Sequence, residues 1–73
     1  MNEVHDCRVD ILLNETGKYA EYTSRRQLVT ETFGRSLMEH LKRSGSGCRL
    51  VRIVTGRIRS QRNEVVLEEV PRR

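Results

Sequence analysis

Four side chains in the sequence are potential metal ligands: His5, Cys7, His40 and Cys48. Their number matches a structural zinc site, in which thiolate and imidazole groups complete a tetrahedron. Their spacing does not, because only His5 and Cys7 are close together and the chain has no Cys-x-x-Cys pair. The pattern favours cysteines that pack as small hydrophobic side chains. We therefore expect neither a metal nor another cofactor.

Ser36 and His40 stand four residues apart, a spacing that would place a nucleophile beside a base on one helix face. A working pair also needs an orienting group and a pocket of about 300 Å³ or more. A chain of 73 residues has little material from which to build such a pocket, and it carries no glycine-rich phosphate loop. We therefore expect no enzymatic activity and no small-molecule substrate.

The segment Gly47–Val70 carries positive charge first and negative charge afterwards. Its arginines are Arg49, Arg52, Arg57, Arg59 and Arg62, and its glutamates are Glu64, Glu68 and Glu69. Three interpretations stay open: a nucleic-acid strip, a hairpin whose halves pair by charge, and a tail that binds a protein partner. A strip for single strands normally includes stacking aromatics, whereas Tyr19, Tyr22 and Phe33 lie elsewhere in the chain. We expect at most a weak, non-specific nucleic-acid contact.

Two further arginines, Arg25 and Arg26, fall in the predicted first turn of a helix, where the helix dipole disfavours positive charge. They are either solvated side chains or a contact for an anion or an acidic surface. The predicted partner-binding residues are accordingly Arg25, Arg26, Arg49, Arg52, Arg57, Arg59 and Arg62.

Length and composition limit the chain to one small domain. It has 73 residues, of which 36% are hydrophobic, with one Phe, two Tyr and no Trp, so the core must be thin and aliphatic. The net charge of +4 permits nucleic acid or an acidic partner without demanding either. No signal peptide and no membrane span of roughly 18 apolar residues is evident. We therefore expect a cytosolic protein in which Cys7 and Cys48 are thiols.

Alternating apolar residues predict a half-buried strand over residues 6–13. Turn-forming residues at 14–17 lead into a second strand over residues 18–23, and the β-prone stretch 48–55 is a candidate third strand. Together these strands predict a small antiparallel sheet.

A helix is predicted over residues 25–44. Ser24 and Gln27 fit a capping box at its start, and Gly45 supplies a stop at its end. Apolar residues recur every four positions at Val29, Phe33, Leu37 and Leu41. This stripe is typical of a helix packed on a core, so Phe33 is expected to be buried.

The predicted fold class is α+β: one amphipathic helix packed on a small antiparallel sheet, with a flexible C-terminal tail. Residues 1–56 form the compact core in this prediction, and residues 57–73 form the charged tail. The alternative is a hairpin that turns at residues 60–63. The loose tail is favoured because few apolar residues remain to offset the entropy of ordering it.

The stretch "MNEVHDCRVDILLNETGKYAEYTSRRQLVTETFGRSLMEHLKRSG" resembles the small early transcription regulators that a Xanthomonas phage directs against its host's RNA polymerase. The resemblance extends over the whole chain and includes its length and Arg-rich composition. It implies binding to the polymerase β′ subunit near its N-terminus and to β, with loss of σ, inhibition of host initiation and antitermination. It also implies the cytoplasm of a bacterial host. The alternative function is a non-specific RNA- or DNA-binding accessory protein that uses the Arg-rich C-terminal third.

Overall fold

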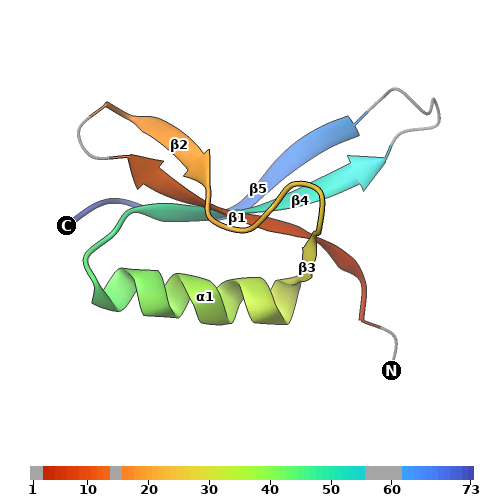
Figure 1. Ribbon diagram of the computed structural model, residues 1–73, viewed down its shortest axis with the longest axis horizontal. Coiled ribbons are helices and arrows are strands. Elements are labelled where there is room, and N and C mark those ends of the chain that lie inside the picture. Colours follow the sequence, from red (N-terminus) through yellow and green to blue (C-terminus); the bar gives the residue numbers. More distant parts are fainter. Residues whose placement is uncertain (1–2, 14–15, 56–61) are drawn as a thin grey trace.

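The computed structural model describes residues 3–13, 16–55 and 62–73, and shows one helix packed on one face of an antiparallel sheet (Figure 1). The elements in chain order are β1 (His5–Leu13), β2 (Lys18–Glu21), β3 (Val29–Thr30), α1 (Glu31–Arg43), β4 (Cys48–Thr55) and β5 (Arg62–Val70). The predicted α+β class, with one helix on a small antiparallel sheet, is confirmed. No helix in the described residues has the length and apolarity needed to cross a membrane.

Strand β1 lies at the centre of the sheet, whose order is β2-β1-β4-β5 with β3 also paired to β1. On one edge, Asp10 of β1 lies opposite Glu21 of β2, and Cys7 lies opposite Val29 of β3. On the other edge, Asp10 lies opposite Arg49 of β4. Because opposed residues in an antiparallel pair share a face, these registers determine which side chains meet on each side of the sheet.

Helix α1 begins at Glu31, so the predicted start at residue 25 is wrong. Its N-cap is Thr30, whose side chain accepts a hydrogen bond from the backbone N–H of Phe33. Residues 22–28 instead form the connection from β2 to β3, in which the N–H groups of Tyr22 and Thr23 donate to the carbonyl of Val9 on β1. The predicted capping box at Ser24 is an isolated turn in this segment. The predicted end of the helix is confirmed, because Gly45 adopts the left-handed conformation (φ 79°) directly after the cap.

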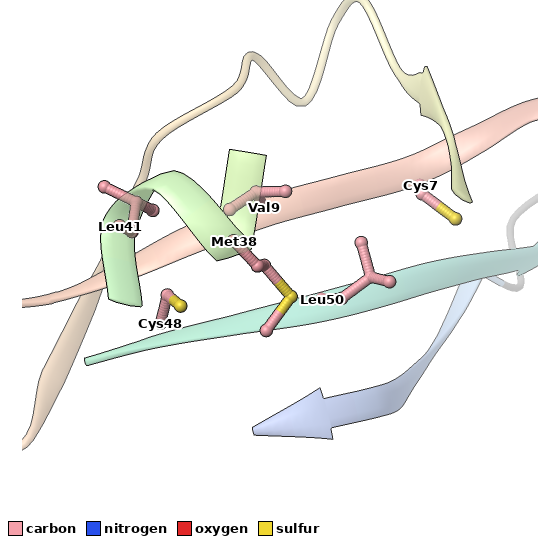
Figure 2. Packing of buried hydrophobic residues seen from close by; sticks show 6 residues of the cluster. All are labelled: Cys7, Val9, Met38, Leu41, Cys48 and Leu50. Carbon is pink, nitrogen blue, oxygen red and sulfur yellow. The ribbon is translucent and has the colours of Figure 1, made fainter. Parts of the chain in front are cut away.

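The hydrophobic core lies between α1 and the centre of the sheet (Figure 2). Its buried members are Cys7, Val9, Met38, Leu41, Cys48 and Leu50. Gly34 sets the helix close to β4, since a Cβ atom on it would lie 2.6 Å from Leu50 Cδ1. The helix therefore faces the sheet with Gly34, Met38 and Leu41, and Phe33 is turned aside with 53% of its surface exposed. The prediction that Phe33 is a core residue is wrong.

Strand β5 replaces most of the flexible tail predicted for residues 57–73. It pairs antiparallel with β4, as in the hairpin alternative. Thr55 lies opposite Arg62 at one end of this pairing, and Cys48 lies opposite Val70 at the other. Leu67 and Val70 pack against the core, and two β5 glutamates bind arginines on β1 and α1. The ordered core therefore extends beyond residue 56. The predicted tail is wrong for residues 62–70, and its residues 57–61 lie outside the described part of the chain.

Replacing Met38 by Ala should lower the free energy of unfolding by about 2–5 kcal/mol, because Met38 is fully buried and its loss leaves a cavity. Replacing Phe33 by Ala on the same helix should lower it by about 1 kcal/mol or less, because the side chain is already half exposed. Urea unfolding followed by circular dichroism measures both. Equal losses would contradict the observed phase of α1.

A chain ending at residue 56 should lose cooperative thermal unfolding. It lacks β5, so Leu67 and Val70 no longer cover the core, and the edge of β4 is left unpaired. Circular dichroism melts of the truncated and full-length chains make the comparison. A melting temperature close to that of the full chain would restore the interpretation of residues 57–73 as a dispensable tail.

Candidate partner-binding surfaces

A buried ion pair lies on the sheet face turned away from α1. Arg8 donates from Nε to Asp10 Oδ1 at 2.8 Å and from Nη2 to Asp10 Oδ2 at 3.0 Å, while Nη1 donates to Glu64 Oε2 at 2.9 Å. The Arg8 and Asp10 side chains are only 7% and 3% exposed. The hydrogen bonds to Glu64 and Asp10 raise the pKa of Arg8. Such a pair is stable only because each charge is fully satisfied.

Arg49, one of the predicted partner-binding residues, belongs to this same face. Its Nε donates to Asp10 Oδ2 at 2.9 Å, and its guanidinium carbon lies 4.1 Å from the ring centre of Tyr19. The Tyr19 hydroxyl in turn donates to Glu69 at 3.2 Å. The cationic group of Arg49 is therefore held by the protein itself, through an ion pair and a cation–π contact.

Arg52 lies on the opposite face of β4, because residues three positions apart in a strand point to opposite sides. It forms ion pairs with Asp6 and with Glu31 at the start of α1. Arg35 of α1 also binds Glu31, and hydrogen bonds from Arg35 and Arg52 lower the pKa of Glu31. Arg49 and Arg52 therefore do not form one strip, and the predicted arginine surface is not brought together there.

The other predicted arginines are dispersed. Arg25 and Arg26 lie in the loop between β2 and β3 rather than in a helix, and Arg25 pairs with Glu21 at 2.8 Å. Arg26 is exposed and forms no salt bridge within the described residues. Arg62 begins β5 opposite Thr55. The predicted positions Arg57 and Arg59 lie outside the part of the chain that the structure describes.

An apolar hollow of about 520 Å³ lies at the N-terminal end of α1. Phe33, Leu28 and Val29 form its apolar lining, and Glu3 and His5 contribute polar groups. We call this surface the Phe33 groove. Sequence periodicity missed it because the four-residue repeat assigned Phe33 to the core, whereas the close contact at Gly34 sets a different helix phase.

A second surface, the basic end, lies where the C-terminal segment passes the connection between α1 and β4 (Figure 1). It comprises Arg72 and Arg73, Lys42 and Arg43 in the last turn of α1, and Lys18 opposite Leu13. Two hollows of about 390 and 230 Å³ lie here, and both are lined by Arg72 and Arg73. The two C-terminal arginines were not among the predicted partner-binding residues. They follow Pro71 and lie outside the central arginine segment, so no helix or strand periodicity in the sequence pointed to them.

The side chains considered for metal binding do not gather at one site among the described residues. Within residues 3–13, 16–55 and 62–73, no three His, Cys, Asp or Glu side chains gather to hold a metal ion. Burial, with a hydrogen bond to Asp6, raises the pKa of Cys7 to about 11, and burial also raises the pKa of Cys48. Both thiols are therefore protonated at neutral pH and are poor nucleophiles. Ser36 and His40 are exposed on α1.

Replacing Asp10 by Asn should lower the free energy of unfolding by about 3 kcal/mol or more, because Arg8 would remain buried without its counter-charge. Replacing Glu64 by Gln is the control. It removes a half-exposed partner of the same arginine, and should cost about 1 kcal/mol or less. Urea unfolding at neutral pH compares the two, and similar losses would contradict the buried position of Asp10.

Acid should weaken the same network. The hydrogen bond from Arg8 lowers the pKa of Glu64 below its ordinary value of 4.5. The contribution of the ionised Glu64 carboxylate to the free energy of unfolding is therefore complete above pH 4.5. This contribution is lost as the pH falls through the pKa of Glu64 in the folded protein. The Glu64→Gln variant should show a smaller loss of stability on acidification than the parent chain. An unchanged acid response would mean that Glu64 is not paired in solution.

The chain matches no protein-family model, no curated protein and no solved structure. Its role is therefore inferred from its own residues, their geometry and the resemblance described above.

Proposed function

We propose that the chain is a phage-encoded transcription regulator that binds host RNA polymerase in the bacterial cytoplasm. It contacts the β′ N-terminal region and β, displaces σ to inhibit host initiation, and promotes antitermination. It acts by binding rather than by catalysis. The choice of polymerase as partner is supported by the sequence resemblance, and the structure supports the more general role of a protein-binding module.

The observation that carries this role is the Phe33 groove. Phe33 is the chain's single phenylalanine, and 53% of its surface is exposed beside a hollow of about 520 Å³. Val4, on the segment leading into β1, is 66% exposed. Aromatic side chains in or beside pockets are typical anchors of protein interfaces, where they lose water on binding. An apolar groove rimmed by polar groups therefore favours a protein partner.

The sheet and helix hold this groove in a fixed shape. Thr30, which caps α1, pairs with His5 of β1, so the start of the helix is anchored to the central strand. Arg52 ties Glu31 on the helix to Asp6 on β1. A preformed groove loses less conformational entropy on binding than a mobile one, which favours affinity.

A non-specific RNA- or DNA-binding accessory role is the second candidate. The observation in its favour is that Arg72 and Arg73 form no salt bridge with any described residue. Arg49 and Arg52 no longer support it, because each is held by internal carboxylates. A net charge of +4 is compatible with both candidates.

Replacing Phe33 by Ala should weaken binding to purified, nuclease-treated bacterial RNA polymerase at least tenfold, about 1.4 kcal/mol or more, as expected for an aromatic anchor. Tyr22→Ala is the matched control, because Tyr22 is another half-exposed aromatic (46%) that does not line the groove. The immobilised protein is titrated with core enzyme, and release of σ from holoenzyme is followed in parallel.

Three outcomes separate the alternatives. Binding of the parent chain that persists after nuclease treatment, with a loss confined to Phe33→Ala, supports the proposal. Equal losses for Phe33→Ala and Tyr22→Ala would remove the groove as the contact surface. Loss of binding by the parent chain after nuclease treatment would favour the nucleic-acid role instead.

A further inference from the structure

Most of the described cations that form no salt bridge lie near the C-terminal end of α1. Among the described residues, the carboxylates that form salt bridges are Asp6, Asp10, Glu21, Glu31, Glu39, Glu64 and Glu68. They neutralise the arginines on both sides of the sheet, including Arg8 and Arg49 on one side and Arg52 on the other. Among the described residues, the cations available to an external anion are therefore those outside these networks.

The basic end carries four such cations. Among the described residues, Lys18, Arg43, Arg72 and Arg73 form no salt bridge, while Lys42 pairs with Glu39 at 3.2 Å. Lys18 belongs here because it lies opposite Leu13, which lines the larger hollow together with Arg72 and Arg73. A cluster of unneutralised cations next to a concave surface creates a local positive potential that attracts anions.

The C-terminal segment is fixed against the body of the protein. Pro71 follows directly on β5, and the N–H of Arg73 donates to the carbonyl of Gly45 at 3.2 Å. Gly47 lies so close that a Cβ atom on it would be 2.9 Å from the backbone N of Arg72. Arg72 and Arg73 are exposed side chains on a backbone held in place, which lowers the entropy lost when they bind a ligand.

The side chains of Arg72 and Arg73 favour phosphate groups as a ligand. Arginine provides a planar fork that matches phosphate oxygens in two hydrogen bonds, and both hollows contain Arg72 and Arg73 with Ser46. Among the described residues that line them, none is aromatic. Recognition of bases by stacking is therefore not provided, and a contact here would read only the backbone of a nucleic acid.

We propose that the basic end binds the phosphate backbone of a nucleic-acid strand without base preference, independently of the Phe33 groove. The two surfaces lie at opposite ends of α1, whose 13 residues span about 20 Å. A protein held on a partner by the groove thus presents its arginines at a distance from that contact. This contact is additional to the leading proposed function, which requires only the protein partner, and it assigns to the basic end the nucleic-acid binding that was given as the second candidate.

The test compares two double variants of the full chain by fluorescence anisotropy with a short, labelled oligothymidylate. Arg72→Gln with Arg73→Gln removes two cations from the basic end. Arg25→Gln with Arg26→Gln removes two from the β2–β3 loop and causes the same change in net charge. The first variant should weaken binding at least tenfold and flatten the slope of log K against log salt by about 1.4, the value for two lost single-strand phosphate contacts. The second should bind nearly as the parent chain does.

Equal losses in the two variants would overturn the proposal, because net charge alone would then explain binding. Labelled polyglutamate that binds as tightly, with the same dependence on Arg72 and Arg73, would overturn it in favour of an acidic polypeptide. Phe33→Ala should leave oligonucleotide binding unchanged, so the outcome is independent of polymerase binding. Amide NMR shifts of the parent chain on titration provide a second readout. They should change at Gly45 and Gly47, and an absence of change there would also overturn the proposal.

Discussion

The buried pair of Arg8 and Asp10 is the interaction on which the arrangement of the sheet depends. It occupies the central strand on the face that α1 does not cover, and both side chains are almost completely removed from water. Two buried charges are tolerated only when their hydrogen-bonding capacity is met. Arg49 from β4 and Glu64 from β5 meet it here, so the pair ties the neighbouring strand β4 and the more distant strand β5 to β1.

The other face of the sheet is stabilised by close packing of small and medium side chains. Cys7 and Cys48 are fully buried among aliphatic residues, and Gly34 allows α1 to approach Leu50. The edge of this layer is tied by arginine, since Arg35 of α1 binds Glu68 of β5. The small core is thus supplemented on both faces by arginine–carboxylate contacts, which suits a chain with one phenylalanine and no tryptophan.

Local signals in the sequence were sufficient for the central strand and for the end of the helix. The alternation from Cys7 to Leu13 predicted β1, and Gly45 predicted the stop of α1, because both depend on neighbouring residues alone. The helix start was misplaced because Ser24 is as good a local capping residue as Thr30. The contacts of residues 22–23 with Val9 and the pairing of Val29 with Cys7 exclude a helix there.

The remaining errors concern contacts between distant residues. Strand β5 is stabilised by the contact of Glu64 with Arg8, which lies 56 positions earlier in the chain. The number of apolar residues near β5 in the sequence does not reveal this contact. Among the candidate site residues, the opposite faces of Arg49 and Arg52 follow from the period of a strand and were predictable once residues 48–55 were assigned as one. The Phe33 groove was not predictable, because the phase of α1 is set by Gly34 against Leu50.

The position of β1 at the centre of the sheet has a consequence for the order in which the chain folds. The strand precedes β2 to β5 in the chain, yet one of its edges is completed only by β4, with Cys7 opposite Arg52. The chain between β1 and β4 must close into a loop, at a cost in conformational entropy, before contacts between these strands can compensate that cost. Domains rich in such distant pairings fold in roughly milliseconds to seconds. Local pairing with β2 can form early, but the charges of Arg8 and Asp10 acquire all their partners only after β5 has been made. The sheet is therefore completed late, and the Phe33 groove and the basic end take their final shape only after β5 has been synthesised.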